Sequence, residues 1–205
     1  RAPLQVRSAF TAVADGARAV AGNHAVIGAL GIVVIMNLMY YSYIPLVPVF
    51  ADKVLGVGPT LLGVLGSAQG FGAFISTIFI ATRRKISRSS TYYVTGTLIA
   101  FTGLLAFSLS RVYSLSVAAL VVAGMGMSGF LTMLFTLVLL SVQEDMRGRV
   151  MGFVNVAIGV SPVSMLLLGW MAGSFGPGLA VTISSSLGLA LTALWSYRAR
   201  EMRKL

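Results

Sequence analysis

The chain has 205 residues, a formal net charge of +10, a mean hydropathy of +0.92 and no cysteine. Charged residues make up only 10% of it, against about 25% in an ordinary soluble domain. This excludes a soluble globular protein, and the lack of cysteine with a single histidine excludes a disulfide framework or a Cys/His metal site. We therefore expect no metal and no cofactor.

The first segment, residues 1–24, is predicted to be a connector on the cytoplasmic side. An amphipathic helix is expected over 6–21, with apolar residues on one face and Arg7 and Arg18 on the other. Such a helix is typical of a segment that lies on the membrane surface. Because the chain begins at Arg1 rather than Met, we expect it to be part of a longer protein; the alternative is a processed or trimmed start.

After this connector, long stretches carry no Asp, Glu, Lys or Arg, and each is long enough to cross a bilayer, which takes about 20 apolar residues. Pro45 and Pro48 are expected to close the first helix, and Pro59 to begin the second. Six spans are predicted within a bundle over 25–197, at about 25–47, 60–82, 91–110, 114–141, 150–174 and 179–197.

Two of the uncharged stretches are longer than a single membrane crossing. The stretch 112–143 is too long for one straight crossing and too short for two, so it predicts one long or bent helix. The stretch 150–197 is long enough for two spans, and we divide it at the breaker Gly176-Pro177-Gly178. Division at Pro162 would leave a stub too short to cross, so Pro162 is predicted to kink a span.

The basic residues test this arrangement, because six spans divide the connectors between two sides. One side holds only Lys53 and Arg111. The other side holds the remaining thirteen, namely Arg1, Arg7, Arg18, Arg83, Arg84, Lys85, Arg88, Arg147, Arg149, Arg198, Arg200, Arg203 and Lys204. The positive-inside rule places this second side, with both termini and the basic tail 198–205, in the cytoplasm.

These features predict an all-α, polytopic membrane protein with six transmembrane helices and both termini cytoplasmic. The basic residues sit at span ends rather than in a stripe beside aromatic residues, so membrane lipids are expected partners and nucleic acid is not. A membrane-embedded enzyme is disfavoured, because no span contains an Asp, Glu or Cys, or a His deeper than His24 at the end of the first, to act as base, nucleophile or ligand.

Few polar side chains lie within the spans, and four are candidates for contact with a small-molecule substrate: Asn37, Tyr40, Gln69 and Asn155. Asn and Gln are costly when they face lipid, so each should face protein or a cavity. The alternative for each is a hydrogen bond between helices. For Tyr40 and its neighbours the alternative is the aromatic belt at the membrane surface, an interpretation that is strongest for Tyr43.

Four segments carry a resemblance to a known family: PLVPVFAD at 45–52, GVLGSAQGFG at 63–72, EDMRGRVMG at 144–152 and GWMAGSFGP at 169–177. In combination they resemble the C-terminal half of a major facilitator superfamily transporter. Within that superfamily they are most similar to the branch that holds enterobactin exporters and macrolide efflux proteins. The resemblance covers nearly the whole chain.

The resemblance implies half of a twelve-helix fold, with a missing N-terminal six-helix half as the partner. It also implies secondary-active efflux of a drug-like or siderophore-like small molecule by alternating access, and a bacterial inner (plasma) membrane location. Because no predicted span contains an acid, the coupling group of a proton-driven transporter would be expected outside this chain. The alternative is a non-transporting membrane scaffold or a half-size dimeric membrane protein.

The loop between the second and third spans departs from the superfamily's gating motif, because its basic residues remain but its acid is absent. Arg83 or Arg84 could instead pair with Glu144 or Asp145, near Arg147, and close the cytoplasmic face. The alternative is that the two acids stabilise the positive N-terminus of the fifth span.

Overall fold

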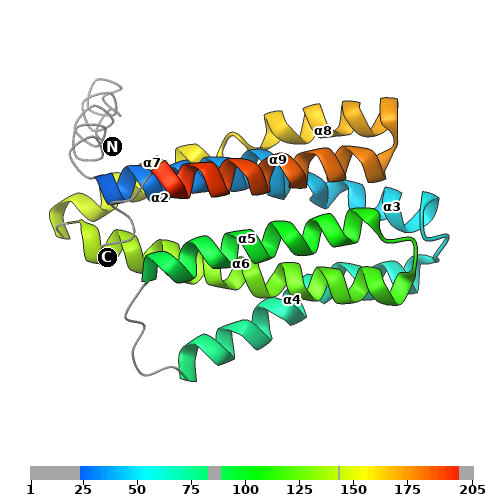
Figure 1. The fold of residues 1–205 in the computed structure, drawn as a ribbon, viewed down its shortest axis with the longest axis horizontal. Helices are drawn as coiled ribbons and strands as arrows, with labels where there is room; N and C mark the ends of the chain where they lie inside the picture. The colour runs from blue at the N-terminus through cyan, green and yellow to red at the C-terminus, as the bar shows by residue number, and fades with distance from the viewer. Residues whose placement is uncertain (1–23, 83–88, 143, 199–205) are drawn as a thin grey trace, which may run out of the picture.

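The computed structural model describes residues 24–82, 89–142 and 144–198, and within these ranges all regular structure is helical (Figure 1). The described helices form six candidate membrane spans, which confirms the predicted all-α, six-helix fold class. The predicted surface helix over 6–21, the loop with Arg83 and Arg84, and the tail after Arg198 lie outside the described residues.

The elements follow one another in an elongated bundle. They are α2 (His24–Ile35), η1 (Met36–Tyr40), η2 (Tyr41–Leu46), α3 (Val47–Lys53), α4 (Pro59–Thr82), α5 (Ser89–Leu109), α6 (Tyr113–Ser141), α7 (Glu144–Ile158), α8 (Ser161–Phe175) and α9 (Pro177–Arg198). The first four elements make up the first span, and α7 with α8 makes up the fifth.

The first span is longer than the sequence predicted. The expected closure near residue 47 was wrong, because the chain remains helical to Lys53. Pro48 lies in the first turn of α3, where a missing backbone N–H costs no hydrogen bond, and Pro45 lies in a 3₁₀-helical segment. The fifth span likewise begins at Glu144 rather than at 150, because a helix can continue past the apolar region into water.

Glycines let α6 lie against α4 and α5 almost backbone to backbone. A Cβ atom built on Gly72 would fall on the carbonyl oxygen of Val121, and one on Gly124 would fall on that of Gln69. Gly126 is closed in by the backbone of Ala100 in the same way. Because lipid provides no hydrophobic force between helices, this close packing is what holds the three helices together.

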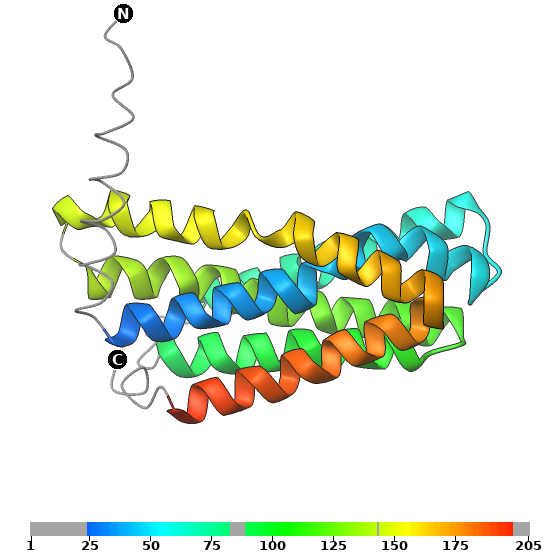
Figure 2. The same ribbon diagram turned by 90° about the horizontal axis from the view of Figure 1, so that it is seen from above.

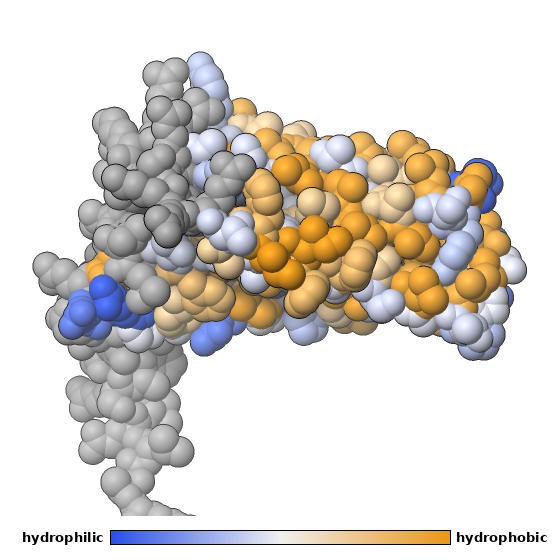
Figure 3. All heavy atoms as spheres, turned by 90° about the horizontal axis from the view of Figure 1, so that it is seen from below, coloured by the Kyte–Doolittle hydropathy of each residue, from blue (hydrophilic) through white to orange (hydrophobic). Residues whose placement is uncertain are grey.

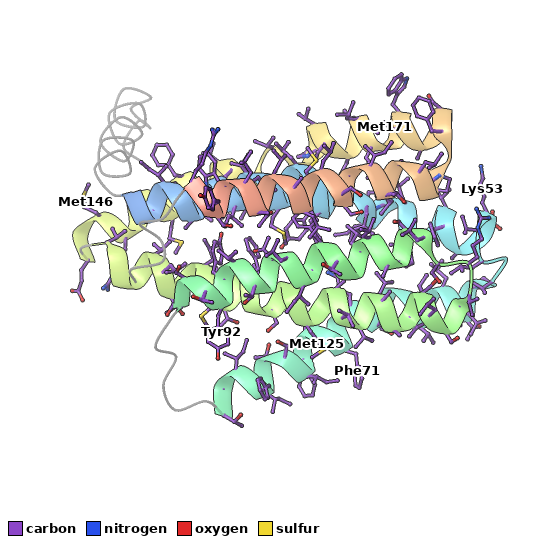
Figure 4. The ribbon with its side chains drawn as sticks, in the orientation of Figure 1. Lys53, Phe71, Tyr92, Met125, Met146 and Met171 are labelled. Carbon is purple, nitrogen blue, oxygen red and sulfur yellow. The ribbon has the colours of Figure 1, made fainter. Side chains whose placement is uncertain are left out.

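The surface of the bundle is apolar along most of its length. Figure 3 shows a hydrophobic band between more hydrophilic ends. Helix α4 contributes much of this band, since Phe71 is 61% exposed and projects away from the neighbouring helices (Figure 4). An exposed apolar surface of this extent suits lipid or another membrane-embedded helix, and does not suit water.

The start of α2 and the end of α9 lie at the same end of the bundle (Figures 1 and 2). Lys53, at the end of the first span, and Met146, near the start of the fifth, lie at opposite ends of the long axis (Figure 4). The described chain therefore crosses the bundle an even number of times.

The glycine contacts predict a position-dependent cost of adding one methyl group. We expect Gly124→Ala to destabilise the bundle by about 1–3 kcal/mol, because the new Cβ forces α6 away from α4. Gly66→Ala is the matched control, since no described atom lies within 4 Å of a Cβ at Gly66. Thermal unfolding of the purified variants in detergent measures the difference, and equal melting temperatures would contradict the packing account.

Candidate functional site

The first span is interrupted near its middle. Its backbone passes from α-helix to a π-helical turn, η1, in which the Tyr41 N–H bonds to the Met36 carbonyl, and then to the 3₁₀-helical η2. Pro45 has no N–H to continue a regular ladder, and the Ser42 hydroxyl donates to the Leu38 carbonyl (2.7 Å). Local residues, Pro45 and Ser42, therefore favour this change of helix type.

Hydroxyl groups of neighbouring helices bond to backbone carbonyls of the interrupted first span. The Ser164 hydroxyl of α8 donates to the Asn37 carbonyl (3.0 Å), and the Ser184 hydroxyl of α9 donates to the Met39 carbonyl (2.7 Å). An unsatisfied carbonyl in a membrane costs several kcal/mol, so these serines stabilise the break and fix its position.

The fifth span is interrupted as well, at Gly159 and Val160 between α7 and α8 (Figure 2). Pro162 lies in the first turn of α8 and cannot donate to the Ile158 carbonyl. The Ser161 Oγ lies 2.7 Å from this carbonyl oxygen, so its single hydrogen can be shared between this carbonyl and a second acceptor, Asn37 Oδ1. The prediction that Pro162 lies within one kinked span, rather than between two spans, is confirmed.

Asn37 joins the two interruptions. Its side-chain Oδ1 accepts from the Ser161 hydroxyl (2.8 Å), and its Nδ2 donates to the Val33 carbonyl (2.9 Å). The side chain is only 2% exposed, so these bonds form away from water. Of the two alternatives that the sequence left open for Asn37, the interhelical hydrogen bond is present.

A second polar cluster surrounds Gln69 of α4. The Tyr43 hydroxyl donates to Gln69 Oε1, while Gln69 Nε2 donates to the Tyr40 hydroxyl (3.2 Å) and to Met127 Sδ of α6 (2.8 Å). Tyr43 is buried in this cluster. Its predicted place in the aromatic belt was therefore wrong, because the amide of Gln69 gives the hydroxyl a partner inside the bundle.

Two hollows lie beside the broken first span. The outer pocket, of about 310 Å³, lies between the first span and α4 and is lined by Tyr43, Ile44, Val47, Pro48, Leu62, Leu65, Gly66, Gln69 and Leu120. The break pocket, of about 230 Å³, lies where the two interruptions meet and is lined by Val33, Asn37, Tyr41, Phe130, Leu131, Leu134, Ile158, Ser161 and Met165. Both are mainly apolar, with a few polar groups, as is typical of small-molecule sites.

The four predicted substrate residues are distributed unevenly around these pockets. Gln69 lines the outer pocket and Asn37 lines the break pocket, whereas Asn155 is exposed on α7. Tyr40 is 0% exposed and lines neither. The sequence analysis missed Tyr41 and Ser161; the Gly-x-Ser-Pro pattern around residue 161 was the available signal for a break with its own hydroxyl donor.

Most of the predicted cytoplasmic gate lies outside the described residues. Arg83 and Arg84 lie outside the described residues, as does the side chain of Asp145. Glu144, the first residue of α7, forms an exposed ion pair with Arg147 one turn later, with 3.4 Å between Oε1 and Nη1. Its place at the helix start is favourable for an acid, because the N-terminus of a helix is positive.

A polytopic bundle whose spans break at mid-depth, beside pockets lined by apolar and uncharged polar groups, is the architecture of a membrane transporter. Comparison with protein families agrees with this class. The family model for the Major Facilitator Superfamily matches residues 29–204, and the chain belongs to that superfamily. The superfamily consists of multi-pass membrane transporters and not of enzymes, and the chain is a membrane transporter protein in this general sense. A search of curated proteins returned no match.

The bonds of Asn37 predict unequal effects of removing two asparagines. We expect Asn37→Ala to lower the stability of the bundle by about 1–2 kcal/mol, because Ser161 loses a buried acceptor and the two breaks lose their link. Asn155→Ala is the matched control and should change stability little, since Asn155 is exposed. Thermal unfolding in detergent checks the order, and an equal loss in both variants would contradict it.

Proposed function

We propose that this chain is the C-terminal half of a twelve-span exporter, of the enterobactin exporter and macrolide efflux branch, that moves drug-like or siderophore-like molecules by alternating access. The observation that carries the proposal is the pair of aligned breaks, each beside a pocket. The pockets are apolar with uncharged polar groups. Such a lining suits an amphiphilic molecule better than a sugar or a phosphate, which would need more polar or charged partners.

A missing N-terminal six-helix half covers the face on which α4 and α8 are exposed. The glycines of this face, Gly63, Gly66 and Gly70 on α4 with Gly169 and Gly173 on α8, have no described atom within 4 Å of a Cβ position. Glycines elsewhere in the bundle permit close helix contact, so these positions fit helices of the second half. The exposed Asn155 then faces the space between the halves.

The breaks in the first and fifth spans act as the hinge points of the transport cycle. The Asn37 side chain connects them, so the segments on either side bend together. The substrate pathway opens alternately to the two sides as the halves rock. Arg83, Arg84, Glu144, Asp145 and Arg147 gate the cytoplasmic side.

The membrane is the inner (plasma) membrane of a bacterium, and both termini lie in the cytoplasm. The asymmetry of the basic connectors supports this orientation. The protein works as a secondary-active antiporter, and the ion-coupling acid lies in the N-terminal half, because the acids in the described spans, Asp52, Glu144 and Asp145, lie at helix ends rather than at mid-depth.

Gln69→Ala tests the export function. The change enlarges the outer pocket and removes the amide that holds Tyr43. We expect the intact transporter, expressed in efflux-deficient bacteria, to change its relative export of two amphiphilic compounds by about tenfold. The amount of protein in the membrane should stay the same. Thr102→Ala is the control, because the exposed Thr102 hydroxyl bonds, among the described residues, only to the Leu98 carbonyl of its own helix.

Export that is unchanged in Gln69→Ala for every compound that the wild-type protein exports would contradict the placement of the substrate in the outer pocket. If the wild-type protein lowers the accumulation of none of the compounds, the export function itself is contradicted, and a membrane scaffold or half-size dimer is favoured.

A further inference from the structure

The break pocket has a polar side, and the proposed function does not say which of its groups contacts a ligand. Most of its lining is aliphatic or aromatic, and the polar groups Asn37, Tyr41 and Ser161 lie together where the first and fifth spans are interrupted. Its volume of about 230 Å³ exceeds the roughly 150 Å³ that holds a benzene molecule in a protein interior. One ring with a small substituent therefore fits.

Two of these three polar groups already bond to the protein. Asn37 Oδ1 accepts from Ser161, and Asn37 Nδ2 donates to the Val33 carbonyl. The Ser161 hydroxyl has a single hydrogen, and two acceptors, Asn37 Oδ1 and the Ile158 carbonyl, lie within 2.8 Å of its oxygen. Neither side chain can turn toward a ligand without giving up a bond that holds the breaks together.

Tyr41 is different from both of them and from its neighbour Tyr40. The Tyr40 side chain is fully buried, and its hydroxyl accepts from Gln69. The Tyr41 side chain is partly exposed and lines the break pocket, and its hydroxyl has no hydrogen-bond partner in the part of the chain that the structure describes. The Tyr40 ring, edge-on to Tyr41 at 5.8 Å between centroids, helps to hold its position.

An unpaired hydroxyl hydrogen in apolar surroundings costs more free energy than an unpaired acceptor lone pair. A ligand oxygen that accepts this hydrogen is therefore the partner that stabilises the group most. We propose that the break pocket is a ligand subsite for a ring-sized apolar group that carries a carbonyl or ether oxygen, and that Tyr41 recognises this oxygen by donating its hydroxyl hydrogen. This assignment rests on the proposed transport function, since it requires that ligands reach the pocket. It makes Tyr41, not Tyr40, the tyrosine that contacts the ligand.

Benzophenone is a suitable probe, because one ring and the carbonyl can enter the pocket while the second ring lies at its open edge, where Leu131 and Ile158 are exposed. When irradiated, the carbonyl forms a covalent bond to nearby C–H groups. The intact transporter in lipid nanodiscs is irradiated with increasing benzophenone, and the labelled residues are identified by mass spectrometry. We expect saturable labelling of Leu131, Leu134, Ile158 or Met165 in the pocket lining. Diphenylmethane, which has the rings without the carbonyl, should compete poorly.

Tyr41→Phe removes only the hydroxyl and keeps the ring. We expect it to raise the half-saturating benzophenone concentration about fivefold, because one hydrogen bond to the ligand is lost. Tyr40→Phe is the matched control and should leave labelling unchanged, while it lowers the melting temperature because Gln69 loses a buried acceptor. Equal labelling of wild-type and Tyr41→Phe protein would overturn the proposal, as would labelling that never saturates and spreads over the lipid-facing residues.

The labelling experiment tests the subsite, and the export assay tests the transport function, so their results can be distinguished. Saturable, Tyr41-dependent labelling in a protein that exports nothing would support the subsite and overturn the proposed export. Export with no saturable labelling of the pocket would support the export and overturn the subsite.

Discussion

A bilayer contains no water that could bond to a backbone carbonyl released from its helix, so a break in a membrane span needs donors from within the protein. This constraint explains the polar groups of this chain. Ser164 and Ser184 donate to carbonyls of the interrupted first span, and the Ser161 hydroxyl lies within bonding distance of the carbonyl that Pro162 cannot reach. Asn37 then joins the two interruptions to one another. The spans can break at mid-depth because these side chains complete the hydrogen bonding.

Helix packing divides the bundle into a closely packed part and an interrupted part. Helices α4, α5 and α6 approach through glycine, where even one methyl group would collide with a backbone. The fifth span, in contrast, is interrupted, because its two halves are separated by Gly159 and Val160. Closely packed helices beside an interrupted span allow bending at a defined place.

The sequence was sufficient for the coarse architecture. Charge-free stretches and the Gly176-Pro177-Gly178 breaker predicted six spans, because the bilayer fixes the length of a crossing helix. The pattern also predicted that Asn37 and Gln69 face protein or a pocket, since lipid cannot pair with an amide. Proline was less informative. Pro45 and Pro48 were predicted to end the first helix, but Pro45 lies within a 3₁₀-helical segment and Pro48 lies in the first turn of the α-helix that follows it.

The roles of the three tyrosines could not be predicted, because they depend on rotation about the helix axis. A regular helix fixes the angle between Tyr40, Tyr41 and Tyr43, but the π-helical turn alters that angle at this point. As a result Tyr43 points inward to Gln69, Tyr40 is enclosed, and Tyr41 lines the break pocket. Only the three-dimensional structure separates the enclosed tyrosine from the accessible one.

The central claim is that the face of α7 at Asn155 lines a water-filled pathway and not lipid. The chain has no cysteine, so Asn155→Cys is a single reporter in the intact transporter once any cysteine elsewhere is replaced. The account predicts that this thiol reacts with a membrane-impermeant methanethiosulfonate added to either side, because only a hydrated thiol ionises readily. Leu187→Cys, on the exposed apolar face of α9, should not react. An Asn155→Cys thiol as inert as that of Leu187→Cys would contradict the account.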